Sequence, residues 1–396
     1  MLKQVISVQT LHSRWSVTLY TTYLKTQIRS RFSNSDTIPA LSGQQQPSSN
    51  KTPKGLKEKK ENVTKTSRPS CQPVLDRFDE QYGRELGDVW PSARSVLLDP
   101  DSWQYGVMLN RFATLNDITN LLQSKGFSSF LPQTHAPILP NTGSPAMCFL
   151  HPRPVRFPSQ VHWRGVLKQY YLLNAASLLP VLALQLMDGE KVLDLCSAPG
   201  GKALAIMQTA NPALLCCNES DPHRKEWLAQ TLESFLPRSL SNRVILSNQD
   251  GRFFGLSEAG TYDKVLVDAP CSNDRSWLYS SNRQQGELRL KLRASLPALQ
   301  AQLLRSALCA VRPGGVVVYS TCTLSTNENA EVVGAVLDSC PEAELDDLWE
   351  ELATPFSAHF TFIQPHHHRR RCGLLVVPTP GRTWGPMYLC RIRRRG

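Results

Sequence analysis

The sequence has eleven cysteines but no two of them at the Cys-x-x-Cys spacing typical of structural zinc sites. Their number is odd, and no secretory hydrophobic segment precedes them, so a disulfide framework is not indicated. We therefore expect reduced thiols in an intracellular protein and no bound metal. The run His366–His368 stands beside Arg369–Arg371, and a short run of this kind is more typical of an exposed loop than of a metal site.

Long apolar runs are also missing. The longest one, from Leu172 to Met187, is interrupted by Asn174, Pro180 and Gln185. A membrane-spanning helix needs about 20 predominantly apolar residues. We therefore expect no membrane-spanning segment and no membrane partner.

Acidic residues are scarce at both ends of the chain. Residues 1–35 contain five Lys or Arg and no acid, which predicts a mitochondrial presequence and a location in the mitochondrial matrix; a generic disordered basic tail is the alternative. Residues 36–70 are rich in Ser, Gln, Lys, Thr and Pro, which indicates a disordered linker.

Residues 366–396 contain eight Arg and no acid, whereas 71–365 carry a net negative charge. An RNA-binding surface would therefore be a local patch together with the arginine-rich end, and a solvated tail is the equal alternative.

Residues 71–165 are predicted to form an N-terminal lobe. Apolar residues recur there at helical spacing, with charged residues between them: Val74, Leu75, Phe78, Tyr82 and Leu86. Proline-rich stretches follow at 132–158, so helical and irregular segments are expected. The lobe has two open interpretations, an RNA-positioning role and a structural cap.

From about residue 166 onward, short apolar runs alternate with helical patterns, which predicts an α/β domain at 166–396. Its sheet is expected to be doubly wound and mostly parallel. The predicted parallel strands are 191–195, 214–218, 243–247 and two runs that end at Asp268 and Tyr319; the predicted helices begin at Gly201 or span 222–235 and 297–311. Two late apolar runs, 372–377 and 387–392, are predicted to close the sheet as a hairpin.

The loop after the first predicted strand is a candidate cofactor site. Its glycines let the backbone approach a ligand, and the following helix offers free N–H groups at its amino end. The dinucleotide fingerprint and the P-loop pattern are both absent, so a nucleoside that carries a carboxylate fits better than a phosphate. The candidate cofactor-binding residues in this loop are Cys196, Ser197, Ala198, Pro199, Gly200, Gly201 and Lys202.

Three acidic residues stand at successive strand ends. Glu219 follows the second strand, where an acid can bind both hydroxyls of a ribose; Asp250 follows the third strand, and Asp268 ends the fourth. These are the places where S-adenosylmethionine contacts its methyltransferase fold, with the amino-acid moiety on the first loop and the adenine near Asp250. Each single acid has helix capping as an alternative role, Asp250 especially, but their joint placement favours a cofactor site.

Two cysteines follow the fourth and fifth predicted strands directly. Cys271 lies in Asp268–Ser272 and Cys322 in Tyr319–Thr323, which places both thiols at the carboxyl ends of parallel strands. The separation of 51 residues suits one right-handed crossover through a helix, so we expect the two strands to be neighbours. A thiol is a good nucleophile, and two of them at one edge predict covalent catalysis with separate attack and release roles.

Three motifs, Cys196–Lys202, Asp268–Ser272 and Ser320–Thr323, resemble in order and spacing the NSUN-type (Sun/Fmu) RNA cytosine-5 methyltransferases over residues 70–396. The resemblance implies a Rossmann-like class I methyltransferase fold and S-adenosylmethionine as cofactor. It also implies that Cys322 is the nucleophile, that Cys271 assists release, and that Asp268 hydrogen-bonds the cytosine. Lys202 or the positive helix end is a candidate for lowering a thiol pKa.

Several departures from the family pattern narrow the resemblance. Asn273–Trp277 stands where the family commonly has glycine-rich sequence, and Ala203 replaces the usual threonine. With the presequence and the ending 383–388, these departures are similar to the vertebrate mitochondrial tRNA branch, which implies methylation of the wobble cytosine in the anticodon loop of mitochondrial methionine tRNA. We expect the protein to be a monomer. Mitochondrial ribosomal RNA as substrate, a catalytically silent RNA-binding assembly factor and a small-molecule methyltransferase are the alternatives; the paired thiols disfavour the last two.

Overall fold

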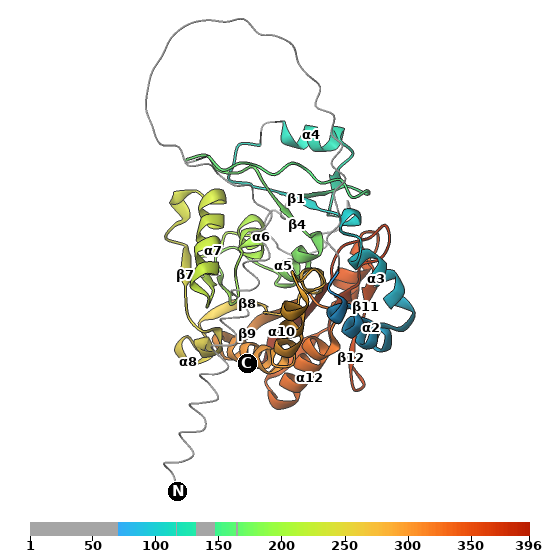
Figure 1. Ribbon diagram of the computed structural model, residues 1–396. Helices are drawn as coiled ribbons and strands as arrows, with labels where there is room; N and C mark the ends of the chain where they lie inside the picture. The colour runs from blue at the N-terminus through green and yellow to red at the C-terminus, as the bar shows by residue number, and fades with distance from the viewer. Residues whose placement is uncertain (1–69, 116, 132–146, 164) are drawn as a thin grey trace, which may run out of the picture.

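The structure of the protein is a computed structural model that describes residues 70–396, apart from 116, 132–146 and 164. A central β-sheet is covered by helices, and a smaller sheet lies beyond one end of it (Figure 1). The predicted presequence at 1–35 and the predicted linker at 36–70, apart from its last residue, lie outside the described residues.

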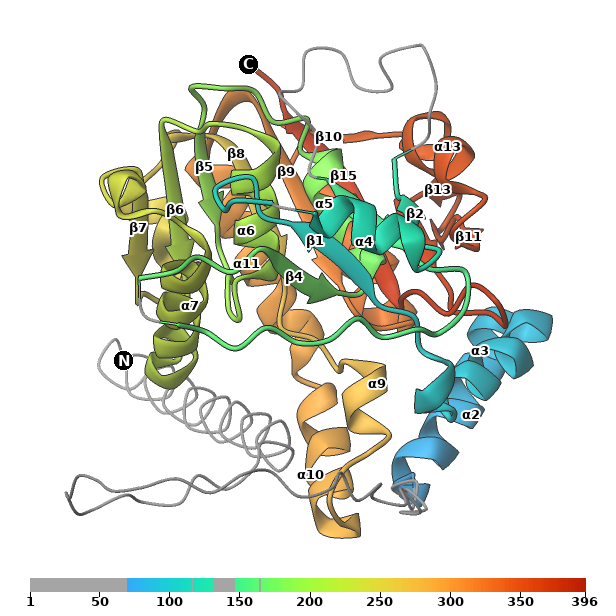
Figure 2. The ribbon, with the colours of Figure 1, turned by 90° about the horizontal axis from the view of Figure 1, so that it is seen from above.

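The central sheet has nine strands in the order β11-β14-β15-β9-β8-β5-β6-β7, with β10 paired to β15. The strands are β5 (Lys191–Asp194), β6 (Leu214–Asn218), β7 (Val244–Ser247), β8 (Tyr262–Asp268), β9 (Val311–Thr321), β10 (Ala343–Asp346), β11 (Phe362–Ile363), β14 (Leu374–Val376) and β15 (Met387–Arg394). Strands β9, β8, β5, β6 and β7 are parallel, and β15 runs antiparallel to β9 (Figure 2). The five predicted parallel strands and the closing β14–β15 hairpin are confirmed.

Successive side chains of the parallel strands alternate between two hydrophobic cores, because a strand directs them to opposite faces. In β5, Val192 packs into one core and Leu193 into the other; in β9, Val316 and Val318 face the first core and Val317 the second. Burial on both faces explains why these strands read as continuous apolar runs.

Helices supply the other half of each core. The first core contains residues of α5 (Leu179–Ala183), α6 (Gly201–Thr209), α7 (Pro222–Phe235) and α13 (Thr354–Phe356). The second contains residues of α2 (Gln72–Leu86), α3 (Trp90–Leu97), α8 (Phe254–Ser257), α9 (Asp274–Trp277), α10 (Arg283–Arg293), α11 (Leu296–Ala310) and α12 (Ala330–Ser339). Among the helices of the described residues, none is long and apolar enough to cross a membrane.

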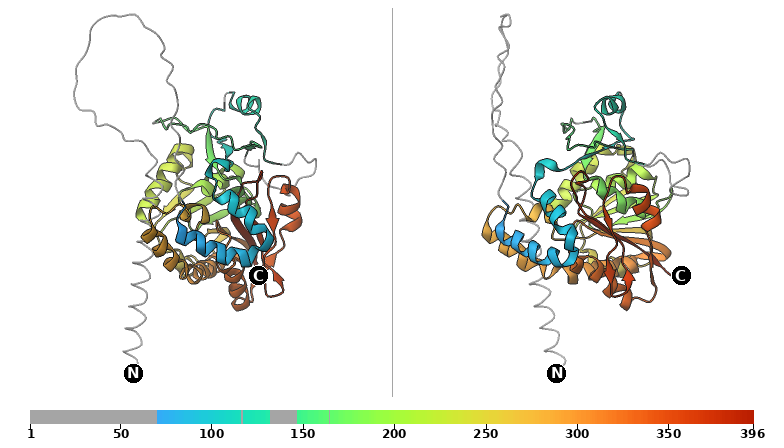
Figure 3. Two further views of the ribbon diagram at one scale, coloured as in Figure 1. Left: turned by 45° about the vertical axis from the view of Figure 1, so that its right-hand side comes forward. Right: turned by 90° about the vertical axis from the view of Figure 1, so that its right-hand side faces the viewer.

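The region predicted as an N-terminal lobe divides between two places. Helices α2 and α3 pack into the second core of the central sheet (Figure 3). The backbone N–H of Cys71 donates to the carbonyl of Leu278, 2.6 Å away. The smaller sheet has the order β2-β3-β1-β4, and α4 lies beside it. Its members are β1 (Gly106–Leu109), α4 (Ile118–Ser124), β2 (Ser128–Ser129), β3 (Cys148–Leu150) and β4 (Tyr170–Leu173). Because β4 pairs with β1, this sheet extends past the predicted boundary at 165.

The last part of the arginine-rich carboxyl-terminal segment forms a strand of the central sheet. Strand β15 lies between β14 and β9. Arg391 on β15 is buried and forms ion pairs of 2.7 Å with Asp346 and 2.7 Å with Glu351. Arg391 therefore belongs neither to a solvated tail nor to an RNA-binding surface, because its guanidinium is paired with two acids inside the fold.

The histidine run is not simply an exposed loop. Strands β12 (His366–His367) and β13 (Arg370–Arg371) form a small hairpin against α12. The ring of His367 is buried, with Nδ1 3.0 Å from a Glu331 carboxylate oxygen. It fits beside Gly334, where a Cβ would come within 2.1 Å of the ring. The expectation of an exposed loop is therefore wrong for this residue.

Candidate active site

The carboxyl ends of five neighbouring parallel strands, β9, β8, β5, β6 and β7, form one edge of the sheet. The side chains predicted for catalysis and cofactor binding follow these ends. Because β8 pairs directly with β9, the loops that carry Cys271 and Cys322 are adjacent, as the sequence predicted.

The two cysteine sulfurs lie in contact. Cys271 Sγ is 3.3 Å from Cys322 Sγ, and the backbone N–H of Cys322 donates to Cys271 Sγ over 3.3 Å. Neither sulfur belongs to a disulfide among the described residues; Cys271 is buried, whereas Cys322 is partly exposed. The hydrogen bond with Cys322, together with burial, raises the pKa of the Cys271 thiol well above its usual value. Cys271 therefore stays protonated and can donate to Cys322, the more accessible sulfur.

Asp268 lies beside the two thiols at the end of β8. Lys202 Nζ donates to one carboxylate oxygen over 2.7 Å, and Ser320 Oγ donates to the other over 2.9 Å. Burial lowers the pKa of Lys202, but the charge of Asp268 and this hydrogen bond offset that effect and leave the lysine pKa above its usual value. The ion pair Lys202–Asp268 thus joins the predicted cofactor loop to the edge of the sheet that carries the two cysteines, the predicted catalytic edge.

The predicted cofactor loop is packed against α7 and hydrogen-bonded to the ends of β5 and β6. Gly200 has a φ of +104°, and a Cβ there would lie 3.1 Å from Leu228 of α7. Ser197 donates its backbone N–H to the Asn218 carbonyl over 2.8 Å and its hydroxyl to Asp194 Oδ2 over 2.8 Å. The loop can therefore approach α7 only with glycine at this position, and its backbone is fixed before any ligand binds.

Asp194, the last residue of β5, has an unsatisfied oxygen. Asp194 is 1% exposed, and its Oδ1 atom has no hydrogen-bond partner among the residues that the structure describes. Burial raises the pKa of Asp194 to about 7, although the hydrogen bond from Ser197 opposes the rise. A buried acceptor without a donor is costly, and the ammonium group of an amino-acid moiety is a donor that would satisfy it. The residues present thus fit S-adenosylmethionine.

Glu219 follows β6 and is almost fully buried. Its Oε1 atom accepts the backbone N–H of Asp221 over 3.0 Å, and its Oε2 atom is 3.1 Å from the guanidinium of Arg224. Burial raises the Glu219 pKa, and the charge of Arg224 opposes the rise. Arg224 also donates to the Ala198 carbonyl over 2.8 Å. One arginine therefore connects the predicted ribose acid to the predicted cofactor loop.

Asp250 follows β7 and caps the short helical turn Gly251–Phe253. Its Oδ1 atom accepts the backbone N–H of Arg252 over 3.0 Å, and its carboxylate also pairs with the Arg252 guanidinium. Capping, the alternative role given above, is thus what Asp250 does in this structure. Its predicted place near an adenine stays a prediction.

Asp194, Asn218 and Arg224 belong to the site, although the sequence did not single them out as site residues. Asn218 is buried at the end of β6, where its side-chain amide donates to the carbonyls of Leu195, at 3.1 Å, and Gln249, at 3.0 Å. It therefore ties three strand-end loops together. Asp194 and Asn218 could have been found in the sequence, because each is a polar residue at the end of an apolar strand. The only sequence feature that marks Arg224 is its position in the first turn of a predicted helix.

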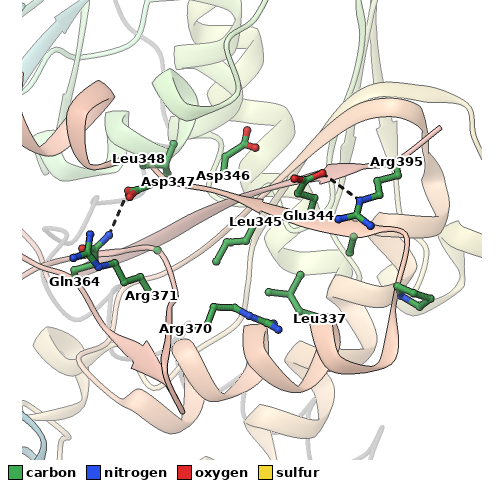
Figure 4. A pocket seen from close by; sticks show the side chains of 13 residues that line it. Leu337, Glu344, Leu345, Asp346, Asp347, Leu348, Gln364, Arg370, Arg371 and Arg395 are labelled. Carbon is green, nitrogen blue, oxygen red and sulfur yellow. Dashed lines mark hydrogen bonds and ion pairs between the residues drawn. The ribbon is translucent and has the colours of Figure 1, made fainter.

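A pocket of about 350 Å³ lies elsewhere on the molecule, beside β10 (Figure 4). Strand β10 pairs with Arg391–Arg394 of β15, the part that lies opposite the middle of β9 and not its carboxyl end near Cys322. Polar side chains at its wall pair with each other: Arg395 donates to Glu344 over 3.2 Å, and Gln364 donates to Asp347 over 3.3 Å. This pocket is therefore not part of the catalytic edge.

Solved structures with a similar fold include a methyltransferase homologue from Pyrococcus horikoshii, at a TM-score of 0.56 and 22% identity over 82% of this chain and 98% of that one. NSun6 from Pyrococcus horikoshii, solved with SFG, has a TM-score of 0.57 and 16% identity over the same shares. At these identities the likeness concerns the fold alone, and it confirms the predicted fold class.

Sequence relatives cover most of the chain. A mitochondrial tRNA (cytosine(34)-C(5))-methyltransferase from Danio rerio is 54% identical over 84% of this chain and 90% of its own length, and the Mus musculus protein of the same name is 49% identical over 86% and 94%. The 5-cytosine rRNA methyltransferase NSUN4 of Mus musculus is 37% identical over 81% and 88%. The family model described as 16S rRNA methyltransferase RsmB/F matches residues 181–372, which include both cysteine motifs. With paired thiols and a cofactor loop at one sheet edge, the chain belongs to the NSUN-type (Sun/Fmu) family of S-adenosylmethionine-dependent RNA cytosine-5 methyltransferases.

Proposed function

We propose that this protein methylates carbon 5 of the wobble cytosine, position 34, in a mitochondrial tRNA, with methionine tRNA as the expected substrate. The identity of 54% to a relative named for that reaction carries the proposal, against 37% to the one named for ribosomal RNA. The basic, acid-free first 35 residues support a place in the mitochondrial matrix. We expect the protein to act as a monomer on the anticodon loop, where an unpaired base leaves its stack at low cost.

In the proposed mechanism, Cys322 adds through its thiolate to carbon 6 of the cytosine, which makes carbon 5 nucleophilic. Asp268 hydrogen-bonds the amino edge or the ring nitrogen of the base and favours this addition. S-adenosylmethionine supplies the methyl group. A base then removes the carbon-5 proton, the electron pair re-forms the double bond between carbons 5 and 6, and the bond from carbon 6 to Cys322 breaks. Division into addition and elimination replaces one difficult step with easier ones.

Cys271 assists the elimination. Its sulfur is 3.3 Å from that of Cys322, and its raised pKa keeps the proton on it. The S–H group can therefore donate to the Cys322 sulfur as negative charge develops there. A carbon–sulfur bond breaks more readily when the departing thiolate is stabilised in this way.

The cofactor is held by the loop after β5 and by Glu219. The backbone of Cys196–Lys202 is expected to hold the amino-acid moiety, with Asp194 accepting from its ammonium group. Glu219, oriented by Arg224, accepts from the ribose hydroxyls, and Asp250 lies nearer the adenine. The unsatisfied Asp194 oxygen supports this arrangement.

Cofactor affinity is expected to depend on pH through Asp194. Because burial raises the pKa of this acid to about 7, it is mostly protonated at pH 6 in the ligand-free protein, and an ammonium ligand prefers the ionised form. Binding of S-adenosylhomocysteine, measured by calorimetry, should strengthen about fivefold from pH 6 to pH 7. Asp194→Asn should bind more weakly at pH 7 and lose this slope; an unchanged slope in the variant would assign it to another group.

The choice between tRNA and ribosomal RNA can be tested directly. Purified protein with S-adenosylmethionine should methylate a transcript of mitochondrial methionine tRNA at cytosine 34, located by bisulfite sequencing, and a tRNA with uridine at position 34 should be inert. Depletion in cells should remove the same methyl group. Methylation of mitochondrial ribosomal RNA with an inert tRNA would overturn the proposed substrate and leave the family assignment standing.

A further inference from the structure

The residue that follows each catalytic cysteine is hydrogen-bonded to the loop of the other cysteine. Ser272 Oγ lies 2.9 Å from Thr323 Oγ1, and both side chains are fully buried. The two loops therefore touch directly next to the thiols. Whatever fixes Ser272 and Thr323 also fixes the contact between the sulfurs.

Glu328 fixes the loop of Cys271. It lies six positions after Cys322, in the short helical turn Thr326–Glu328, and is 1% exposed. Its Oε2 atom accepts the backbone N–H of Ser272 over 2.9 Å, and its Oε1 atom accepts the Ser272 hydroxyl over 2.6 Å. Gln300 adds a third donor to this carboxylate, at 3.1 Å, and also donates to the Pro270 carbonyl over 2.9 Å. The backbone is thus held on both sides of Cys271.

Asp274 fixes the loop of Cys322 in the same manner. It lies three positions after Cys271 and is fully buried. Its Oδ1 atom accepts the Thr323 hydroxyl over 2.9 Å, and its Oδ2 atom accepts the backbone N–H of Leu324 over 2.7 Å. Each cysteine loop is therefore followed by an acid whose carboxylate accepts hydrogen bonds from the other loop.

One arginine balances the two acids. Arg293 Nε lies 3.3 Å from Glu328 Oε1, and Arg293 Nη2 donates over 2.7 Å to the hydroxyl of Tyr82, which itself donates to Asp274 over 2.8 Å. Tyr82 belongs to α2, so the amino-terminal helix completes this network. Buried acids need such partners, because an unpaired charge there is costly.

We propose that Glu328 and Asp274 are positioning residues with separate roles in the reaction: Glu328 holds Cys271 for release, and Asp274 holds Cys322 for attack. The inference rests on the roles proposed above for the two thiols. Neither acid is expected to touch the cytosine or the cofactor, because the oxygens of each are engaged by the neighbouring loop. They act by keeping the two sulfurs in contact while one of them is bonded to RNA.

Glu328→Gln should slow release selectively. The substitution keeps the size of the side chain but turns one acceptor oxygen, which faces N–H and O–H donors, into a donor. With the full chain and tRNA, the denaturant-resistant protein–RNA adduct should form within about threefold of the normal single-turnover rate. Its decay to methylated product should fall about 10- to 100-fold, since small misplacements near reacting atoms have effects of that size. Adduct should therefore accumulate at steady state.

Asp274→Asn should show the opposite pattern. The grip on Thr323 and Leu324 weakens, so adduct formation itself should slow by about 10- to 100-fold, and no adduct should accumulate. Glu331→Gln is the matched control, because this acid is half-exposed, pairs with His367 and lies outside the network. Its adduct formation and decay should both be normal.

Equal slowing of formation and decay in both variants, or release by Glu328→Gln at the normal rate, would overturn the separate roles. Should Glu328→Gln fail to fold, which a melting curve shows, Ser272→Ala removes one of the contacts to Glu328 and should show a smaller accumulation of adduct; normal release there would equally count against the proposal. Failure of the mechanism is distinguishable, because then no adduct forms even with Cys271→Ala.

Discussion

Replacing Cys322 by serine is expected to abolish methylation, with a fall of at least about 10⁴-fold in the single-turnover rate, the scale seen when an enzyme loses its nucleophile. A hydroxyl is far less acidic and less polarisable than a thiol, so it is a much poorer nucleophile here. Serine is nevertheless close to cysteine in size, so the substitution should not disturb the packing. Cys322 is the partly exposed member of the thiol pair, and its backbone N–H, which donates to Cys271, survives the change. Transfer of labelled methyl groups to the tRNA transcript measures the effect, and no denaturant-resistant adduct should form.

Cys309→Ser is the matched control for this experiment. Cys309 is an exposed free thiol on α11, outside the catalytic edge, so its replacement should leave the rate within about twofold of the original. Alkylation of the protein with iodoacetamide should inactivate it in proportion to modification at Cys322. More than a tenth of the original activity in Cys322→Ser would show that this thiol is not the nucleophile.

The sequence was sufficient to predict the parallel sheet and the meeting of the two thiols. The parallel strands of the sheet are short apolar runs between turns and helices, and each cysteine follows its run directly, so strand direction alone placed both at one edge. Strand β15 was found by its apolar run, but its position between β9 and β14 and the ion pairs of Arg391 were not predictable. They depend on pairing between residues far apart in the chain.

The acidic residues of the site also show that local sequence predicts only what depends on local position. Glu219 follows one predicted strand and Asp268 ends another, and local position was enough to single them out. Glu328 and Asp274 lie in short helical turns, and their donors come from the opposite loop, from α10, from α11 and from α2. Nothing local distinguishes them from helix caps. Asp250 is the reverse case: its Asp-Gly-Arg context already indicated the capping role that the structure shows.

Cys271→Ala is expected to trap the protein on its RNA. Attack by Cys322 does not need the second thiol, so the adduct should form within about tenfold of the normal rate. Elimination loses the S–H donor 3.3 Å from the departing sulfur, and turnover should fall by about 10²- to 10⁴-fold, the range for a general acid. A protein–tRNA complex that survives denaturant should therefore accumulate, and ribonuclease should convert it to protein that carries a short nucleotide fragment.

The two thiols can be told apart by combining the variants. The double variant Cys271→Ala with Cys322→Ala should form no adduct, because the sulfur that bonds to carbon 6 is then missing. Cys271→Ser should accumulate less adduct than Cys271→Ala, since a hydroxyl can still donate to the departing thiolate. Because the raised pKa keeps Cys271 protonated, release by the unmodified protein should hold its rate as pH rises through the range where an ordinary thiol ionises. Normal turnover in Cys271→Ala would show that Cys271 has no role in release. A trapped adduct in a variant that lacks Cys322 would reverse the assignment of attack and release.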